Sequence, residues 1–457
     1  MKRRTIEWRS WLTSCILIIS DSAILFGVFR LAVFFRSLVI PVLSKHGNLW
    51  QSVLPLVQMG ILLGISVLLI EGLYPGFGLT AVKELERMSK SVTLVFFFLM
   101  VTSYLIIPFQ VLPRSFLLLS WILALCILPL SHFLIRNIIS RYSWYGIPVI
   151  VFGDGDRAKQ IVQSMKRVRR LGWLPKMVLP TKAINQEITE ANQFKIAIFI
   201  PSTGWSNELY THKLNKVFHK VILITQTNGL GSVWVEPRDL DGQLGLEFHY
   251  NLFNTFSVMI KRLLDFGIGL VLSILMSPLL LILCLLVFLD SPGPIFFYQQ
   301  RMGKGLKVFN MIKFRTMAVD AEQKLNDLLE KDPVAMAEYQ KYHKLTNDPR
   351  LTRMGKWLRR FSMDELPQIV NVLGGSMSVI GPRAYMPSEL NEIGDYSPII
   401  HRIQPGWTGW WQVMGRHETT FHQRLLMDEY YISNWSLWMD VYILMKTVWV
   451  VLSGSGA

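Results

Sequence analysis

The residues best suited to chemistry in this chain are Asp364 and Glu365, two adjacent carboxylic acids. They lie between a basic stretch, KWLRRF, and an apolar stretch, IVNVLGG. Pro367 follows closely, and because proline lacks an N–H group it fits the first turn of a helix. These residues predict a helix that begins near Asp364 and ends at the glycine pair 374–375. Both carboxylates would then lie at the positive end of the helix dipole, which favours their ionised form.

An ionised carboxylate acts as a nucleophile or a metal ligand better than as a general acid. Acids in a first helical turn are also common caps, so the pair alone leaves capping and catalysis both open. Many cations share this part of the chain: Arg301, Lys313, Arg315, Arg350, Arg353, Arg359, Arg360, Arg383, Arg402 and Arg416. Their density is typical of phosphate binding, and a surface that faces lipid headgroups is the alternative.

The composition indicates a membrane protein. Of the 457 residues, 51% are hydrophobic and 17% are charged. A formal net charge of +15 fits either nucleic acid or an anionic membrane as the partner, and the hydrophobicity favours the membrane, so we expect no nucleic-acid partner. Cys15, Cys126 and Cys284 each lie in an apolar run, without the spacing of a metal site or a disulfide framework.

Four apolar segments occupy the first third of the chain, at about residues 11–31, 53–70, 92–107 and 116–135. Each is near the length that a membrane-spanning helix requires, and the third is the shortest. Basic residues precede the first segment, separate the second from the third and follow the fourth. This alternation predicts a four-helix transmembrane bundle with both of its ends in the cytoplasm.

Residues 145–254 have the pattern of a soluble α/β domain. Short apolar runs (PVIVFG, KIAIFIP and KVILIT) alternate there with polar, helix-compatible stretches. Gly153 and Gly155 resemble the start of a dinucleotide fingerprint, but the third glycine position is Ala158. A tight turn that packs a helix on a sheet is favoured over a nucleotide site, and we expect no redox cofactor.

Two further apolar runs leave their topology open. Residues 266–289 are interrupted in the middle by Ser277 and Pro278, so this helix either crosses the membrane or folds back within one leaflet. Residues 437–452 are apolar apart from two charges and are few for a spanning helix. We expect this tail to lie in the membrane interface, and a short spanning helix is the alternative.

Six motifs occur in one order along the second half of the chain. They are YQQRMG (298–303), KFRTM (313–317), NDPRLT (347–352), SMDELPQ (362–368), NVLGGSMSVIGPR (371–383) and QPGWTGWWQVMGR (404–416). Together they closely resemble the bacterial sugar transferase family, the monotopic phosphoglycosyl transferases. The resemblance extends from about residue 261 to the end of the chain. With the N-terminal helices and the α/β segment, the layout is most similar to that of undecaprenyl-phosphate galactose phosphotransferases.

The resemblance implies a membrane protein of the α plus α/β class with three domains. These are a four-helix bundle (1–144), a Rossmann-like α/β domain (145–255) and a monotopic catalytic domain (256–457) with interfacial helices. Ser277 and Pro278 match the break of a re-entrant helix at 266–289, so the resemblance decides between the two topologies. It places the enzyme in the bacterial cytoplasmic (inner) membrane with its catalytic domain in the cytoplasm. The oligomeric state is open, and a homodimer is one candidate.

The resemblance also implies roles for single residues. Asp364 corresponds to the nucleophile and Glu365 to the ligand of Mg²⁺, the expected cofactor. Lys313 and Arg359 match basic positions of the active site. The residues expected to bind substrate are Arg301, Arg315, Arg383, Gln412 and Arg416.

The expected reaction transfers hexose 1-phosphate from a UDP-hexose to undecaprenyl phosphate through a covalent aspartyl intermediate. It would start the assembly of an O-antigen, capsule or exopolysaccharide. Galactose is the first candidate for the sugar and glucose the second. Ala384 replaces the proline that many relatives have after GPR, and TGWWQ (408–412) replaces TGLWQ or TGWAQ. The second departure lies in a stretch expected to contact the nucleotide or sugar, so the donor stays open.

Two other functions fit parts of the sequence. A membrane scaffold could use the glycine turn to sense a nucleotide and the basic tail to bind anionic lipid, but it would not require the carboxylate pair. A polytopic transferase without a covalent intermediate would require acidic groups in its membrane loops. In this chain the acids gather in the C-terminal part instead.

Overall fold

The structure is a computed structural model. It describes residues 2–39, 49–106, 114–185, 194–201, 220–224, 235–240, 243–248, 255–318, 320–332, 350–415 and 419–452, and six single positions, 214, 217, 218, 252, 336 and 348. The chain forms two compact units, Met1–Thr227 and Asn228–Ala457. The predicted helical bundle and α/β domain both fall largely in the first unit, and the division into three domains stays a prediction.

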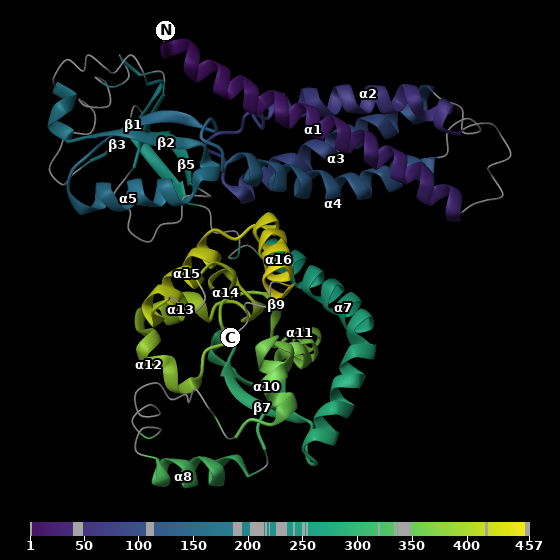
Figure 1. Cartoon of the computed structure of the whole chain (residues 1–457), viewed down its shortest axis with the longest axis vertical. Helices are drawn as coiled ribbons and strands as arrows, with labels where there is room; N and C mark the ends of the chain where they lie inside the picture. Colours follow the sequence, from purple (N-terminus) through teal and green to yellow (C-terminus); the bar gives the residue numbers. More distant parts are fainter. Residues whose placement is uncertain are drawn as a thin grey trace. The chain divides into compact units, whose positions relative to one another are not determined.

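Long helices dominate the first unit (Figure 1). They are α1 (Lys2–Val39), α2 (Leu49–Ile70), α3 (Ala81–Ile106) and α4 (Arg114–Ile139). Their buried faces share one apolar core, and many of their large hydrophobic side chains are exposed. Together with α7 (Thr255–Asp290), they are the five described helices long and apolar enough to cross a membrane. This is compatible with a membrane protein, because lipid can cover such exposed apolar surfaces.

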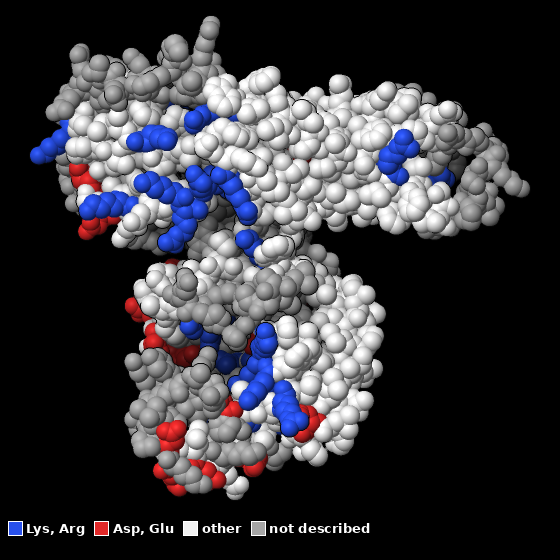
Figure 2. Space-filling model, in the orientation of Figure 1, with Lys and Arg blue, Asp and Glu red and all other residues white. Residues whose placement is uncertain are grey.

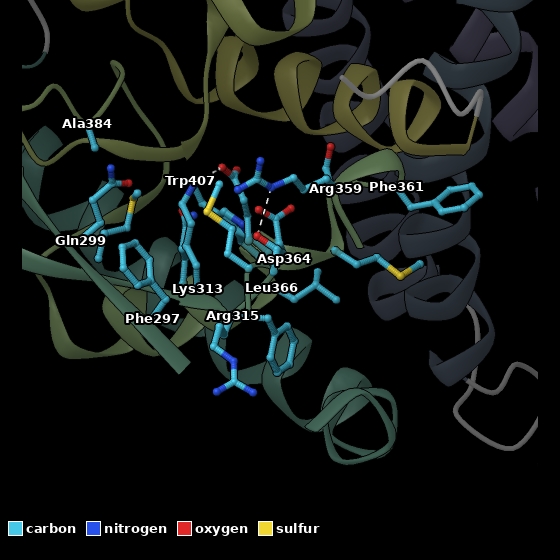
Figure 3. Close-up of a pocket in the computed structure, with 18 of the residues that line it drawn as sticks. Phe297, Gln299, Lys313, Arg315, Arg359, Phe361, Asp364, Leu366, Ala384 and Trp407 are labelled. Atoms are coloured by element: carbon cyan, nitrogen blue, oxygen red, sulfur yellow. Dashed lines mark hydrogen bonds and ion pairs between the residues drawn. The ribbon is translucent and has the colours of Figure 1, made fainter. Parts of the chain in front are cut away.

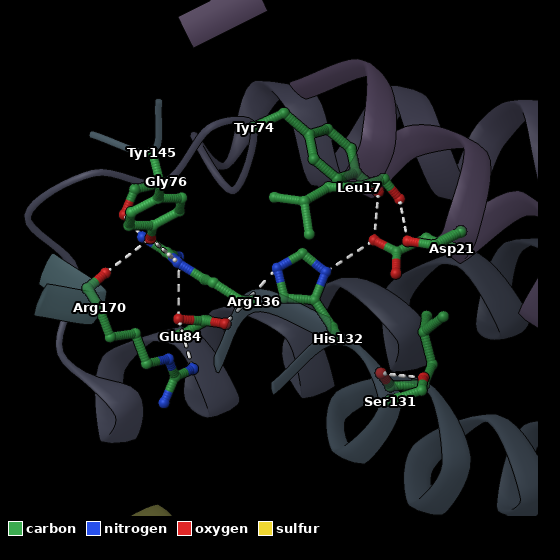
Figure 4. Close-up of polar contacts among 12 residues, drawn as sticks. Leu17, Asp21, Tyr74, Gly76, Glu84, Ser131, His132, Arg136, Tyr145 and Arg170 are labelled. Atoms are coloured by element: carbon green, nitrogen blue, oxygen red, sulfur yellow. Dashed lines mark hydrogen bonds and ion pairs between the residues drawn. The ribbon is translucent and has the colours of Figure 1, made fainter. Parts of the chain in front are cut away.

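A buried polar network lies inside this helical core (Figure 4). One carboxylate oxygen of Asp21 contacts both the Tyr74 hydroxyl and Nδ1 of His132, each at 2.8 Å. Nη1 of Arg136 donates to Glu84 at 2.9 Å. The network therefore joins α1, α3, α4 and the turn between α2 and α3. Its charged groups are paired with one another, because a charge buried without a partner is costly.

A parallel sheet follows the helices, in the strand order β2-β1-β3-β4. The strands are β1 (Ile147–Gly153), β2 (Trp173–Leu179), β3 (Ile196–Ile200) and β4 (Lys220–Leu223). Separate apolar clusters cover its two faces. Three strands match the predicted apolar runs. The pattern missed β2, where Pro175 is tolerated because the strand forms an edge of the sheet.

The glycine turn connects β1 to α5 (Gly155–Arg167). A Cβ atom at Gly153 would lie 3.0 Å from Ile200 and 3.2 Å from Ala158, so the helix packs closely on the sheet here. Gly155 has a φ of +71°, which glycine adopts most easily. The Asp154 carboxylate accepts the Thr181 backbone N–H at 3.2 Å. These contacts fit the predicted packing turn.

The second unit begins with a two-stranded antiparallel sheet, β5 (Val235–Leu240) and β6 (Gln243–Phe248), and continues with the long helix α7. Ser277 and Pro278 both lie inside α7, which continues through them. Their role as the turn of a re-entrant helix stays a prediction. Pro278 cannot donate to the Ile274 carbonyl, and the Ser277 hydroxyl donates to it at 2.9 Å instead. Figure 1 shows the axis of α7 turning along its length.

The two ends of α7 pack on the second unit, whereas its middle is exposed. Near the N-terminal end, Lys261, Asp265 and Gly269 are buried. Near the C-terminal end, Leu283 and Val287 belong to an apolar cluster that also contains Phe314 and Leu358. The exposed middle is apolar: Leu270, Val271, Ile274, Leu275, Leu281 and Ile282.

Short elements form the rest of the second unit. The sheets are the hairpin β7 (Phe296–Met302) and β8 (Val308–Phe314), with the turn η6 (Lys304–Leu306), and the parallel pair β9 (Ser378–Ile380) and β10 (Gly406–Thr408). The main helices are α8 (Ala321–Lys331), α10 (Arg353–Arg360), α11 (Ile369–Gly374), α14 (Trp410–Met414), α15 (Phe421–Ser433) and α16 (Leu437–Leu452).

Polar contacts tie α16 to the start of α7. Nζ of Lys261 donates to Asp440 at 2.7 Å, and the same carboxylate accepts the Tyr431 hydroxyl at 2.7 Å and the Trp435 indole N–H at 3.0 Å. The Asp265 carboxylate accepts the Val379 backbone N–H at 3.0 Å, which ties α7 to β9. The C-terminal helix is thus part of the packed unit, and its interfacial position stays a prediction.

Candidate active site

Asp364 and Glu365 lie on η7 (Met363–Gln368), a 3₁₀ helix that leads directly into α11. The predicted helix therefore begins close to Asp364, with a tighter first turn than expected. It ends as predicted, because Gly375 has a φ of +85° and closes α11 in a left-handed conformation. Ser362, just before η7, also has a positive φ, of 53°. Such strain in a residue that is not glycine is found mainly where the surrounding structure enforces it.

Strand β8 brings Lys313 to the carboxylate pair. Nζ of Lys313 donates to Oε1 of Glu365 at 2.6 Å, a short charge-assisted hydrogen bond. The Glu365 side chain remains 35% exposed, so this group faces the open part of the site. Figure 3 shows Lys313, Asp364 and Arg359 around the same part of the pocket.

The expectation that the surroundings favour the ionised form of both acids is wrong for Asp364, because its pKa is raised and not lowered. Burial raises the pKa of Asp364 to about 6, and the neighbouring Glu365 charge adds to the increase. Lys313 and Arg359 lower this pKa, but they do not offset the loss of water around the carboxylate. The group is still mostly ionised at neutral pH, and its raised basicity suits a nucleophile.

This pKa predicts how activity depends on pH. A raised carboxyl pKa means that the ionised, attacking form is lost as pH falls through about 6. We expect the rate of the first chemical step to decrease about tenfold for each pH unit below that value and to level off above about pH 7. Single-turnover release of nucleotide between pH 4.5 and 8 measures this. A rate that stays constant down to pH 5 would contradict the assignment.

Arg359 reaches the site from the end of α10. Its Nε donates to the Thr316 hydroxyl at 3.0 Å, which leaves the terminal nitrogens to face the pocket. Thr352 caps the start of α10 by accepting the Gly355 N–H at 2.9 Å. The Thr352 N–H in turn donates to the Thr316 carbonyl at 3.1 Å. The backbone around Thr316 therefore sets the position of both the helix and its arginine.

The carboxylate pair lies in a large pocket of about 2650 Å³. Its lining includes the cations Lys313, Arg359 and Arg383. It also includes apolar side chains of α7 and α16: Leu272, Met276, Leu279, Leu444 and Val448. The cavity is large enough for a ligand that combines phosphate groups with hydrocarbon.

Arg301 is held rigidly by its neighbours. It is buried, and its guanidinium donates to the Ala384 carbonyl at 3.0 Å and to Oε1 of Gln299 at 2.9 Å. Burial lowers the pKa of Arg301, and the positive charge of Arg383 lowers it further. Two neighbouring guanidinium groups of this kind favour an anion between them. Both residues are among the predicted substrate-binding positions.

Asp428, on α15, is a functional candidate that the sequence interpretation missed. It is completely buried and accepts the Arg383 backbone N–H at 3.0 Å and the Tyr385 hydroxyl at 2.9 Å. Complete burial raises the pKa of Asp428 to about 7. Its signal in the sequence was weak, because an acid in a helix usually faces solvent. The structure shows that Asp428 holds the backbone from which the Arg383 side chain enters the pocket.

Trp411 lies between two arginines. The guanidinium carbon of Arg383 is 5.4 Å from the ring centroid and that of Arg424 is 5.2 Å away, both within cation–π range. Arg424 was also missed by the sequence interpretation, although it precedes Asp428 by one helical turn on α15. Nε2 of Gln412 donates to the Trp407 carbonyl at 3.4 Å, and Gln412, one of the predicted substrate-binding residues, lines the pocket.

The remaining predicted residues differ in how they relate to the pocket. Arg315 lines it, but its guanidinium donates to the Ser291 carbonyl and points away from Asp364 in Figure 3. Ser277 and Pro278 are not among the residues that line it. Arg416 lies outside the described residues.

The donor set fits Mg²⁺ only together with a substrate. Among the described residues, no three His, Cys, Asp or Glu side chains form a cluster that could hold a metal ion. Asp364 and Glu365 offer two carboxylates, and Mg²⁺ is commonly held by one or two carboxylates plus phosphate oxygens. Since Lys313 occupies Oε1 of Glu365, the metal would compete with an ammonium group for this side chain.

Known proteins with similar sequences are sugar transferases. The family model described as bacterial sugar transferase matches residues 256–454. An uncharacterized sugar transferase of Haemophilus influenzae is 32% identical over 390 residues, 80% of this chain and 82% of that protein. The undecaprenyl-phosphate galactose phosphotransferase of Salmonella typhimurium is 31% identical over 360 residues, 74% of this chain and 75% of that protein.

A third relative differs in the sugar that it is named for. The UDP-N-acetylgalactosamine-undecaprenyl-phosphate N-acetylgalactosaminephosphotransferase of Aeromonas hydrophila is 37% identical over 204 residues, 43% of this chain and 45% of that protein. The named relatives are thus sugar-phosphate transferases with different sugars. The long matches cover most of both chains, and the protein therefore belongs to the bacterial sugar transferase family.

Proposed function

We propose that the protein transfers a hexose 1-phosphate, galactose 1-phosphate first among the candidates, from a UDP-hexose to undecaprenyl phosphate. The products are UMP and undecaprenyl diphosphate hexose. The observation that carries this proposal is the half-buried Asp364 in a pocket lined by both cations and apolar side chains. Cations bind a diphosphate, and apolar side chains can accommodate a polyprenyl chain.

The reaction proceeds in two displacements. In the first, a carboxylate oxygen of Asp364 attacks the sugar-bearing phosphorus, the bond to the bridging oxygen breaks, and UMP leaves with the bonding electrons. In the second, a phosphate oxygen of the lipid attacks the same phosphorus and releases the Asp364 carboxylate. Lys313 and Arg359 offset the charge that develops on the diphosphate oxygens.

Mg²⁺ is the proposed cofactor, with Glu365 as its protein ligand. When bound with the donor, a divalent cation neutralises phosphate charge and supports the departure of UMP. The side chain of Glu365 also accepts a hydrogen bond from the Lys313 ammonium group. Loss of this side chain would therefore remove the metal ligand and also release Lys313.

We predict that Glu365→Gln raises the Mg²⁺ concentration needed for half-maximal activity and lowers the maximal rate by roughly 10–100-fold. An amide lacks the charge that attracts both the metal and Lys313. Magnesium titration of the purified variant measures the shift, and Glu392→Gln, at an exposed acid of the same unit, is the matched control. An unchanged magnesium dependence would show that Glu365 is not the ligand.

The position of α7 supports a re-entrant arrangement in the membrane. A straight helix of this length would reach about 54 Å, more than a bilayer core. Both of its ends nevertheless pack on the same compact unit, while the exposed middle is apolar. We propose that this middle enters one leaflet and returns, so that the site lies at headgroup level on the cytoplasmic side.

Cysteine labelling tests this topology. Phe256 and Tyr298 flank the buried ends of α7 and are both well exposed. We predict that Phe256→Cys and Tyr298→Cys are shielded alike from an impermeant thiol reagent in intact cells and react alike in opened cells. Labelling of Tyr298→Cys alone from outside would indicate a helix that crosses the membrane.

For the first unit we propose a four-helix transmembrane bundle and a Rossmann-like domain with a structural or regulatory role. The protein would act in the bacterial inner membrane, in the first membrane step of O-antigen, capsule or exopolysaccharide assembly. A homodimer is an open proposal. None of these parts is required for the chemistry at Asp364.

The direct test uses purified protein, radiolabelled undecaprenyl phosphate and single UDP-sugars. We expect the highest kcat/KM with UDP-galactose and lower values with UDP-glucose and UDP-N-acetylgalactosamine. A preference for another UDP-sugar would change the donor but keep the reaction class. Failure to form a labelled lipid diphosphate with any of them would overturn the proposed function.

A further inference from the structure

A basic edge lies on the first unit where α5 ends near the end of α4. We define it as Arg141, Lys166, Arg167, Val168 and Arg169, all of which are exposed. Figure 2 shows Lys and Arg side chains gathered on this face of the first unit, where α5 gives way to the long helices. Residues 140–147 and 157–171 contain no acidic residue. The edge therefore carries a concentrated positive charge without local compensation in the sequence.

The edge is fixed to the ends of the membrane-type helices. It continues into η2 (Arg169–Leu171), whose Arg170 pairs with the buried Glu84 of α3 at 2.8 Å. The Arg170 guanidinium carbon lies 3.9 Å from the centroid of the Phe133 ring on α4. The Tyr145 hydroxyl donates to the Arg170 carbonyl at 2.7 Å. The backbone that bears the exposed cations is thus held at the level of the helix ends (Figure 4).

Aromatic and apolar groups accompany the cations. On α4, the exposed apolar residues Leu134 and Ile138 lead to the end of the helix. Tyr142 follows, is 56% exposed and stacks on Trp144 at 6.1 Å between ring centroids. Val168 is 48% exposed in the middle of the basic edge. Across a membrane interface, from the lipid core outward, proteins present apolar residues first, then aromatic residues and then cations. The end of α4 and the basic edge follow this order.

We propose that the basic edge binds the anionic headgroups of the leaflet that surrounds α1–α4. Lys166, Arg167 and Arg169 contact lipid phosphates, and Val168 and Tyr142 reach the boundary of the acyl chains. The sheet and α5 then lie against the membrane surface and do not extend freely into the cytoplasm. Charge complementarity selects anionic phospholipid as the partner, because such headgroups carry the compensating charge that the edge lacks.

The test measures how close the edge is to lipid in the full-length protein. The three native cysteines are replaced by serine, and a bimane fluorophore is attached to Val168→Cys or, as the control, to Gln160→Cys. Gln160 is exposed on the same helix, about two turns before the edge. Each protein is placed in nanodiscs of brominated phosphatidylcholine, either alone or mixed with an equal part of brominated phosphatidylglycerol, so that the bromine content of the lipid is the same.

We expect brominated lipid to quench the fluorophore at 168 and leave that at 160 nearly unchanged, with stronger quenching when phosphatidylglycerol is present. In the variant with Lys166→Glu, Arg167→Glu and Arg169→Glu, the quenching at 168 should be largely lost. Its thermal unfolding midpoint shows whether it is folded, and the comparison of 168 with 160 stands without it. Equal quenching at both positions, or quenching at 168 that is independent of phosphatidylglycerol, would overturn the proposal.

Discussion

Replacing Asp364 by asparagine will abolish turnover and stop the labelling of the protein by a donor that carries radioactive β-phosphate. The substitution preserves the shape of the side chain and removes the negative charge that attacks phosphorus. The expected loss in kcat is roughly a thousandfold or more, as for other enzymes that lose a covalent nucleophile. The labelled intermediate is separated from free donor by acid precipitation, and UMP release is followed in parallel.

Two controls separate this effect from a general loss of structure. Asp395 is an exposed acid of the same unit, and Asp395→Asn should leave both labelling and turnover unchanged. The Asp364→Asn variant should also retain the thermal unfolding midpoint of the native protein or exceed it, because a partly desolvated charge is removed. Wild-type labelling of Asp364→Asn, or UMP release only when lipid acceptor is present, would show that the covalent intermediate is assigned wrongly.

Adding a single methyl group at Gly355 will displace Arg359 and disable the site from a distance. A Cβ atom at Gly355 would lie 2.0 Å from the Thr316 carbonyl oxygen, which is backbone and cannot rotate away. Helix α10 must therefore move away from the segment that binds the Arg359 side chain. We expect Gly355→Ala to lower the free energy of unfolding by roughly 3 kcal/mol, the upper end for overpacking.

The activity of Gly355→Ala should fall by about a hundredfold even where the protein is folded, because a misplacement of about 1 Å has that effect on phosphate positioning. Measurement of kcat well below the unfolding midpoint separates this loss from instability. Gly374→Ala is the matched control, since a Cβ atom there meets nothing within 4 Å. Native activity in Gly355→Ala would mean that the contact between α10 and Thr316 does not position the arginine.

Local patterns in the sequence were sufficient for several elements. Apolar runs of membrane length predicted the positions of α1–α4, because hydrophobicity and length together define a helix that suits lipid. Three of the four strands of the parallel sheet followed from short apolar runs. The end of α11 followed from its glycine pair. In each case the signal is contained in the segment itself, so no distant contact was required.

Other features depend on contacts outside the segment itself, and the sequence patterns did not predict them. Strand β2 contains a proline and a lysine, and only its place at the edge of the sheet makes them acceptable. Helix α7 continues through the Ser277–Pro278 pair, where the Ser277 hydroxyl satisfies the carbonyl that the proline leaves free. Both outcomes depend on contacts that the letters of the sequence do not show.

The sequence by itself was sufficient to indicate the family of this protein, through the ordered motifs, and to select the adjacent acids as the candidate site. Only the tertiary structure decided how strongly Asp364 binds its proton, since burial outweighs the nearby cations. It also brought Asp428 to Arg383 and Arg424 to Trp411, across separations that no local pattern spans. The physical reason is that desolvation and the direction of a side chain arise from packing between distant segments, whereas residue type and spacing are local properties.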